Sequence, residues 1–548
     1  MLTRLVGASI LTIGSVAVLI SHETSSIFPW LPLALFGSGI ILLVAEIPQH
    51  FRTLFATLSS SGYIAYVFAF ASPSLIGRDP DKVAVAVSRV IEFEGIGGIA
   101  NFYFYSAIPG FHLFVAAIGH ALGIPAKQAL VLLGICTPLF LVPGSVLLAR
   151  GWSTKDAAKY ASVIVMVATP VLYYGTRPIP QLLSVILLPS FLILFDGYIQ
   201  KNTSSHFIGL LIVTVALLYS HKLPLVVVLG AALAAAGVEY IRKYWADSVR
   251  VKKYISLSVL FGILLALQQL WLTDFFGTVA NLILPELFDD RVGAPGEVNI
   301  QGIQAVRLLP RTLEVAVGNI DWLVFTLFAG ISWLVVLWWT RKNDVDHTVI
   351  LGAATVSGLV VVLSYLAPTG IATRRIMLFA VVPFAATIGI ALSALSRSIP
   401  NTGRGVVVSV MFIFIISQVS VTAAVPDHPY GTRGYLSPQE VDGKEWTNDH
   451  AAGMVAADFF YAREIVDYDR PGQTYITGPN AVSEGYIQVS ERYLNATVSE
   501  QSYPYILYRP DYRRYTSTYA WRLTWNPEQT FDTSRNRVFD NGGSILYS

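Results

Sequence analysis

Long apolar stretches separated by short polar segments dominate this sequence. About fourteen of these stretches approach the roughly 20 residues with which a helix crosses a bilayer. They cover residues 5–21, 30–47, 55–72, 104–122, 128–149, 159–175, 180–197, 207–220, 223–241, 254–272, 321–340, 347–366, 376–396 and 405–425. The pattern predicts an all-α polytopic membrane bundle of about 13–14 transmembrane helices.

Two polar segments interrupt the apolar pattern, and a polar tail follows it. Residues 73–103 and 273–320 are rich in Asp, Glu and Arg. The tail, residues 426–548, has no apolar run of spanning length and contains short alternating stretches such as GQTYITG and GGSILYS, which are typical of strands. We therefore expect a membrane domain over residues 1–425 and a small mixed α/β domain over residues 426–548.

Lys and Arg in short loops indicate which face of the membrane is cytoplasmic. The basic loops contain Arg52, Arg150, Lys155, Lys159, Lys201, Arg242, Lys243, Arg250, Lys252, Lys253, Arg341, Lys342, Arg397 and Arg404. The segments that alternate with these loops are then predicted to be outside; they are 175–181, 221–222, 273–320, 367–375 and the tail. The expected location is the cell membrane, as a multi-pass protein with an extracytoplasmic C-terminal domain.

This topology leaves one conflict near the N-terminus. If all of the runs crossed, with the N-terminus inside, the segment 73–103 and the tail would lie on opposite faces. Either run 104–122 lies at the surface without crossing, or the N-terminus is outside. The first solution is plausible because this run contains Pro109, Gly110 and two histidines, His112 and His120.

The composition agrees with a membrane protein and excludes several other classes. The chain has 548 residues, of which 54% are hydrophobic and 13% are charged, compared with roughly 25% charged in soluble domains. A net charge of +2 provides no basic field for nucleic acid. The single cysteine, Cys136, excludes an intramolecular disulfide and a Cys-rich metal cluster, and no nucleotide-binding motif is present.

Candidate catalytic carboxylates lie in the first polar segment. Asp79 and Asp81 belong to the sequence GRDPD, which follows the third run, and Glu94 comes later in the same segment. Pro80 disfavours helical geometry at Asp79, which predicts a carboxylate presented at the mouth of the bundle. Such acids could act as a general base or bind a divalent cation such as Mg²⁺ or Mn²⁺. The alternative is an ordinary solvated turn.

Five basic residues lie in the short segments that are predicted to be outside, where the positive-inside bias makes them scarce. They are Arg177, His221, Lys222, Arg374 and Arg375. Cations at such positions are well placed to bind phosphate, and Arg does so with a forked pair of donors. The alternatives are snorkelling side chains or a wrong orientation. Together with the acidic segment, these residues suit a lipid-phosphate sugar, whose tail lies in the bilayer and whose phosphate needs a cation.

Four short motifs resemble the GT-C superfamily of glycosyltransferases. They are Arg78-Asp79-Pro80-Asp81, the stretch YSAIPGFH that starts at Tyr105, Thr176-Arg177-Pro178, and the ending RNRVFDNGG that starts at Arg535. Within the superfamily, the layout of residues 55–548 is most similar to that of haloarchaeal enzymes that transfer mannose from dolichyl phosphate during S-layer N-glycosylation. The acidic motif departs from the pattern of the superfamily in two ways. It follows the third span instead of the first, and Pro80 separates its two acids.

The resemblance implies an inverting hexosyltransferase with a GT-C-like fold. The donor would be a dolichyl-phosphate sugar, with mannose as the sugar in this family, and the acceptor an extracytoplasmic N-linked glycan or glycoprotein. Asp79 would be the base, assisted by Asp81 or Glu94, and Arg374 and Arg375 would bind the phosphate. A divalent cation is a possible cofactor.

Two other classes of function stay open. A lipid-linked-oligosaccharide flippase or secondary transporter would also need many spans and a charged cavity, although it predicts inverted repeats that this sequence lacks. A noncatalytic envelope-assembly protein predicts that Asp79 and Asp81 are dispensable. Asn495, in Asn-Ala-Thr, is a candidate N-glycosylation acceptor in the tail.

Overall fold

The computed structural model describes most of the membrane domain and the central parts of the tail. The described residues are 30–71, 75–76, 78–99, 103–243, 249–273, 305–307, 311–343, 346–366, 373–398, 400–422, 436–458, 461–462, 486–488, 496–498, 503–510 and 521–548. Asn495, the candidate glycosylation acceptor, lies outside them.

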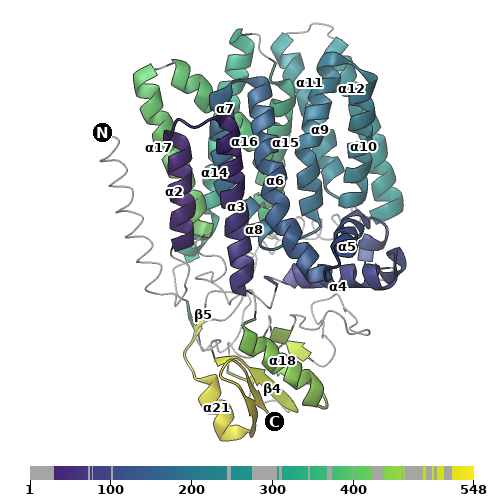
Figure 1. Ribbon diagram of the computed structural model, residues 1–548, viewed down its shortest axis with the longest axis vertical. Coiled ribbons are helices and arrows are strands. Elements are labelled where there is room, and N and C mark those ends of the chain that lie inside the picture. Colours follow the sequence, from purple (N-terminus) through teal and green to yellow (C-terminus); the bar gives the residue numbers. More distant parts are fainter. Residues whose placement is uncertain are drawn as a thin grey trace, which may run out of the picture.

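Long helices run side by side and form a bundle (Figure 1). They are α2 (Trp30–Val44), α3 (Gln49–Ala71), α6 (Ala126–Trp152), α9 (Gln181–Lys201), α10 (Ser204–Ser220), α11 (Pro224–Lys243), α12 (Val249–Leu267), α14 (Arg311–Asn343), α15 (Thr348–Leu366), α16 (Thr373–Ser398) and α17 (Pro400–Thr422). Between α6 and α9 the chain forms two shorter helices, α7 (Lys155–Val167) and α8 (Thr169–Gly175), bent by 45° at their junction. A π-helical turn, η3 (Gln268–Thr273), extends α12.

Among the described residues, six helices are long and apolar enough to cross a membrane, or up to seven if the bent pair α7–α8 is one span. Shorter apolar helices accompany them at Ala34–Val44, Gly110–Leu122, Ser204–Ser220, Thr348–Ser364 and Gly405–Val419. The prediction of a polytopic helical membrane domain is therefore confirmed.

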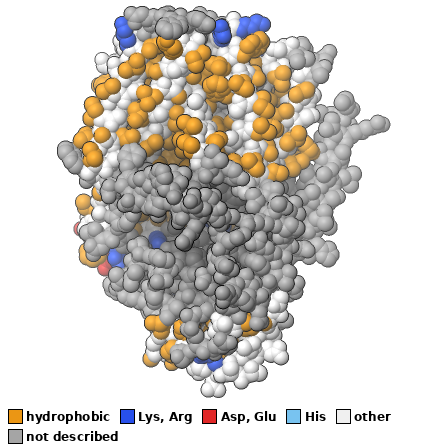
Figure 2. Space-filling model, turned by 180° about the vertical axis from the view of Figure 1, so that it is seen from behind, with side chains coloured by type: hydrophobic (Ala, Val, Ile, Leu, Met, Phe, Trp, Pro, Cys, Tyr) orange, Lys and Arg blue, Asp and Glu red, His pale blue; other side chains and the backbone are white. Residues whose placement is uncertain are grey.

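The outside of the bundle has the surface that lipid requires. Apolar side chains cover its flank, and Lys and Arg gather at the end away from the C-terminal domain (Figure 2). Ile212, Leu327 and Trp338 are among the large hydrophobic side chains exposed there. We call the end with the Lys and Arg residues the basic end, and the opposite end, where the C-terminal domain lies, the domain end.

The first polar segment lies at the domain end and is mostly helical (Figure 1). It forms α4 (Arg78–Glu92) and the 3₁₀ turns η1 (Ile96–Ile99) and η2 (Tyr103–Ser106), followed by α5 (Gly110–Leu122). With 13 residues, α5 is about 20 Å long, which is too short to cross a bilayer. Of the two solutions to the topological conflict, the structure supports the one in which run 104–122 does not cross.

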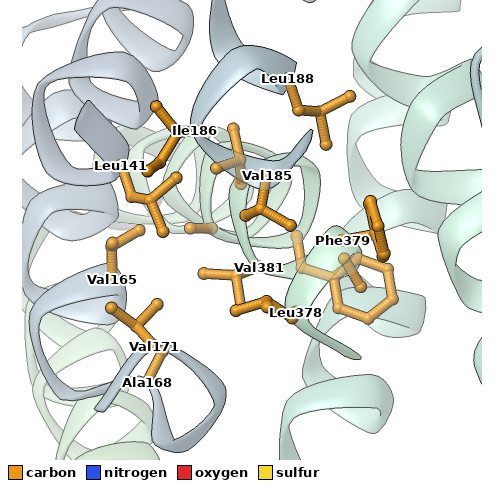
Figure 3. Close-up of a cluster of buried hydrophobic side chains, with 14 of the residues drawn as sticks. Leu141, Val165, Ala168, Val171, Val185, Ile186, Leu188, Leu378, Phe379 and Val381 are labelled. Atoms are coloured by element: carbon orange, nitrogen blue, oxygen red, sulfur yellow. The ribbon is translucent and has the colours of Figure 1, made fainter. Parts of the chain in front are cut away.

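Buried apolar side chains from five helices meet at the centre of the bundle (Figure 3). Leu141 of α6, Val165 of α7, Val171 of α8, Val185 of α9 and Val381 of α16 are all inaccessible to solvent. The central element is α16, because 94% of the apolar window within Arg375–Ser398 is buried. Close packing of this kind holds membrane helices together where lipid offers no hydrophobic driving force.

The C-terminal domain is a small mixed α/β domain, as predicted. Its five-stranded sheet has the order β3-β2-β4-β7-β6, in which β2, β3 and β4 are parallel and β6 and β7 are antiparallel to their neighbours. The strands are β2 (Val455–Ala457), β3 (Tyr486–Gln488), β4 (Tyr505–Tyr508), β6 (Arg537–Asp540) and β7 (Ile545–Tyr547), and the helices are α18 (Pro438–His450) and α21 (Pro527–Ser534).

One strand joins the C-terminal domain to the membrane domain. In the segment between α12 and α14, β1 (Ala305–Arg307) pairs antiparallel with β5 (Trp521–Leu523) of the tail. The segment 273–320 and the tail must therefore lie on the same side of the membrane.

Candidate active site

Asp79 and Asp81 lie in the first turn of α4, so the predicted non-helical turn is wrong. Proline is accepted in the first turn of a helix, where its missing N–H would have no intrahelical partner, and Pro80 occupies such a position. Residues i and i+2 of a helix do not face each other. The two positions therefore lie on different faces of α4, and Asp81 is fully buried. The side chain of Asp79 lies outside the described residues.

Glu94 lies at the other end of α4. It follows the last helical residue, has a left-handed backbone with φ of 49°, and is exposed. Because α4 rises about 1.5 Å per residue, Glu94 is roughly 20 Å from Asp79. The geometry separates this carboxylate from the Asp79 position, so Glu94 is not placed to assist a base there.

Arg177 follows α8 at the domain end and is half-buried. Its guanidinium carbon lies 3.9 Å from the centre of the Tyr173 ring. One buried terminal nitrogen, Nη1, has no hydrogen-bond partner among the described residues. A buried guanidinium N–H of this kind can donate to a phosphate oxygen.

Arg374 and Arg375 lie in the first turn of α16, also at the domain end. Arg375 is half-buried, and the side chain of Arg374 lies outside the described residues. Because α8 packs against α16, Arg177 and Arg375 lie at the same end of two adjacent helices.

His221 and Lys222 form the turn between α10 and α11. The Nδ1 atom of His221 accepts a hydrogen bond from the Leu223 amide at 3.2 Å, which leaves the proton of the neutral ring on Nε2. Burial, with a further contribution from Lys222, lowers the pKa of His221 to about 3. Burial lowers the pKa of Lys222 to about 8, so this ammonium is mostly charged at neutral pH.

The backbone of this turn is held by a second helix end. The Gln268 side chain, at the start of η3, donates to the carbonyl oxygens of Leu218 (2.5 Å) and His221 (3.2 Å). On another side, α5 packs against α10 so closely that a Cβ at Gly110 would lie 2.6 Å from the Tyr219 carbonyl oxygen. The predicted cations thus form two groups, one at α8 and α16 and the other at the α10–α11 turn.

Sequence reasoning used His112 only as a sign of a surface helix and did not identify it as a candidate site residue. It lies in the first turn of α5, is 1% exposed, and contacts the Tyr105 ring edge-on with centroids 4.8 Å apart. Its Nδ1 has no hydrogen-bond partner among the described residues. Burial lowers its pKa to about 4, so the ring is neutral at neutral pH. The feature of the sequence that could have identified His112 is its place next to aromatic residues at the start of a helix.

No group of three or more His, Cys, Asp or Glu side chains that could hold a metal ion occurs among the described residues. Because the Asp79 side chain and much of segment 273–320 lie outside them, Mg²⁺ or Mn²⁺ dependence stays a prediction.

Comparisons with known proteins place this architecture. No family model matches the chain, and no curated protein matches it. The apo oligosaccharyltransferase of Archaeoglobus fulgidus aligns with a TM-score of 0.52 at 9% identity, over 84% of this chain and 70% of that one. AglB, the oligosaccharyltransferase of the same organism, in complex with an inhibitory peptide and a dolichol-phosphate, aligns with a TM-score of 0.51 at 12% identity, over 84% and 69% of the two chains.

The chain has the fold of these two oligosaccharyltransferases, which is GT-C-like. The neighbours are polytopic GT-C glycosyltransferases with a C-terminal domain, in agreement with the architecture described above. At 9% and 12% identity the likeness establishes the fold, and the reaction has to be argued from the site.

Proposed function

We propose that this protein transfers a hexose, mannose in the first instance, from dolichyl phosphate to an extracytoplasmic N-linked glycan. The observation that carries the proposal is the common position of the candidate groups. The candidate groups lie at the domain end: the start of α4 with Asp79, Arg177, the His221–Lys222 turn and Arg375. Most surface Lys and Arg side chains of the bundle gather at the opposite, basic end. By the positive-inside bias, the domain end faces away from the cytoplasm.

The donor chemistry follows from the surroundings of Arg177. A polyprenyl tail can lie along the apolar flank of the bundle, while its phosphate needs a charged partner at the bilayer surface. The Nη1 atom of Arg177 supplies a buried donor without a protein partner among the described residues. The AglB structure contains a dolichol-phosphate, which supports a lipid phosphate as the ligand of a related fold.

The proposed reaction is a single displacement. The Asp79 carboxylate takes the proton of the acceptor hydroxyl as that oxygen attacks the anomeric carbon of the donor sugar. The bond between this carbon and the phosphate oxygen breaks, the configuration inverts, and dolichyl phosphate leaves with the bonding electrons. Arg177 and Arg375 stabilise the negative charge that develops on the leaving phosphate.

The test uses the purified full-length protein, a dolichyl-phosphate mannose donor and a glycan acceptor in detergent. We expect a product whose mass exceeds that of the acceptor by one hexose, and an increased donor KM in Arg177→Gln. A matched control is Arg537→Gln, because Arg537 lies on the surface of the C-terminal domain. Uptake of a lipid-linked sugar by liposomes containing the protein, without any sugar transfer in detergent, would contradict the proposal and favour a transporter.

A further inference from the structure

The span formed by α7 and α8 is broken inside the membrane domain. α7 ends at Val167, α8 begins at Thr169, and the bridging residue, Ala168, has an extended ψ of 115°. A break frees backbone N–H groups from their intrahelical partners, and within a membrane each such group needs another acceptor. The structure therefore has to supply a partner for the amide of Thr169.

Gln418 of α17 supplies this partner. Its Oε1 accepts from the Thr169 amide at 3.0 Å, and its carbonyl oxygen accepts from the Thr169 hydroxyl at 3.1 Å. Its Nε2 donates to the carbonyl oxygen of Asp321 in α14 at 2.8 Å. Thr169, Gln418 and Asp321 are each at most 1% exposed. The glutamine thus ties the start of α8 to both α14 and α17.

The other end of α8 is fixed by backbone packing. Gly175 lies against α6 and α3 so closely that a Cβ at Gly134 would overlap the Gly175 carbonyl oxygen, and one at Gly175 would overlap Ile64. The Thr176 hydroxyl donates to the Tyr173 carbonyl oxygen at 2.9 Å, and Arg177 follows immediately. α8 has seven residues and is about 10 Å long. Its first residue contacts Gln418 and its last residue comes two positions before Arg177, so a change in the direction of α8 moves Arg177.

We infer that Gln418 is a positioning residue, which sets the direction of α8 and through it the place of the Arg177 guanidinium. We call the hydrogen bonds of Gln418 to Thr169 and Asp321 the clamp; they are part of the fold. The consequence for the donor rests on the proposed function.

The test first removes the side-chain hydrogen bonds of Gln418. A second substitution then removes the Thr169 amide, which needs one of those bonds. Gln418→Met keeps the length of the side chain but leaves the Thr169 amide without its acceptor. Thr169→Pro eliminates that amide, since proline has no N–H and is well accepted as the first residue of a helix. The extended Ala168 already has the backbone conformation that a following proline requires.

Two readouts separate the clamp from the proposed function. Hydrogen exchange of the amides of residues 171–175 reports the opening of α8 without any substrate. The donor KM and kcat report Arg177. In Gln418→Met we expect exchange to accelerate about five- to hundredfold and the donor KM to rise, with a smaller change in kcat. Adding Thr169→Pro should bring both values part of the way back towards wild type, because it removes the unpaired amide but also the Thr169 hydroxyl that bonds the Gln418 carbonyl oxygen. Thr214→Val is a matched control, because among the described residues its hydroxyl bonds within its own helix, at the Leu210 carbonyl oxygen.

A second variant serves if Gln418→Met does not fold. Gln418→Glu keeps the acceptor oxygen, and its protonated form also restores the donor to Asp321. Its donor KM should therefore approach wild type as the pH falls.

The possible outcomes have different meanings. Wild-type exchange and wild-type KM in folded Gln418→Met would overturn the clamp. Faster exchange in Gln418→Met, combined with an unchanged donor KM in Arg177→Gln, would support the clamp and contradict the donor role of Arg177.

Discussion

Gly134 of α6 and Gly175 of α8 are in backbone contact: a Cβ at residue 134 would overlap the carbonyl oxygen of residue 175. Only glycine allows this approach, and the contact lies two residues before Arg177. Gly134→Ala should therefore push α8 away from α6. We expect a loss of about 1–3 kcal/mol in stability from overpacking. A raised donor KM should accompany this loss.

Gly262→Ala in α12 is the control for Gly134→Ala. A Cβ at Gly262 would meet no atom within 4 Å, so the substitution only improves helix propensity and should not lower stability. Equal thermal stability and equal donor KM in Gly134→Ala and wild type would contradict the idea that this contact positions Arg177.

The lowered pKa of Lys222 predicts that donor binding weakens at alkaline pH, which would appear as an alkaline limb in a plot of donor KM against pH. Burial lowers its pKa to about 8, so the ammonium is charged below this pH and loses its proton above it. If Lys222 binds the donor phosphate, the donor KM should rise as the pH increases through 8. Lys222→Arg should flatten this limb, because arginine keeps its charge. A limb of the same position and size in Lys222→Arg would remove Lys222 from the phosphate site.

The two buried histidines predict that acid destabilises the domain end. Burial lowers the pKa of His112 to about 4 and that of His221 to about 3, whereas the unfolded chain protonates near 6.5. Below pH 6.5 the unfolded state then binds more protons, and stability falls with pH down to about pH 4. Each histidine should contribute up to roughly 2 kcal/mol of the loss between pH 6.5 and 5.

The measurement is the melting temperature of the purified protein at pH 7 and pH 5. His221→Asn is the informative variant, because an Asn side chain can accept from the amide two residues ahead, as the His221 Nδ1 does for Leu223. It should reduce the difference in melting temperature between the two pH values. The same difference in wild type and in this variant would show that His221 takes up its proton at the same pH in the folded and unfolded states, so that burial does not lower its pKa.

A buried ion pair predicts where the C-terminal domain is most sensitive to substitution. Arg509 donates from Nε and Nη2 to the two carboxylate oxygens of Asp458, at 2.7 and 2.6 Å, and lies 3.7 Å from Glu440. All three residues are at most 3% exposed. Arg509→Gln would leave buried carboxylates without their cation and should cost about 3–5 kcal/mol.

Arg537 provides the surface comparison for Arg509. It pairs with Glu528, Asp532 and Asp540; Arg537 and the two aspartates are exposed, and Glu528 is only half-buried. Arg537→Gln should change stability little, because exposed ion pairs are screened by water. Denaturant unfolding of the full chain, followed by tryptophan fluorescence, measures both variants. Equal losses in the two would contradict the role of burial.

The features that could be predicted from the sequence are those that depend on whether a segment lies in lipid or in water. A run of roughly 20 apolar residues has few environments other than a bilayer, and Lys and Arg are costly to move across it, so the spans and the two ends of the bundle could be predicted. The ending GGSILYS forms β7 at Ile545–Tyr547, because its alternating pattern is local.

Packing decides the features that the sequence did not reveal. Val83, Val85 and Val87 lie in a charge-rich segment whose pattern predicts a polar loop, whereas the packing of α4 buries all three valines. Residues 160–175 contain no charged side chain, and Pro170 is the main local sign that α7 and α8 separate there. The pairing of Ala305 with Leu523 joins segments that are distant in the sequence, so no local pattern could indicate it.

The most direct measurement compares wild type and Asp79→Asn in hexose transfer by the purified protein, with dolichyl-phosphate mannose as donor and the product glycan read by mass. Asn keeps the size of the side chain and removes the base. We predict normal folding, an unchanged donor KM, and a loss of about two to four orders of magnitude in kcat. A product glycan formed by Asp79→Asn at the wild-type rate would contradict the account.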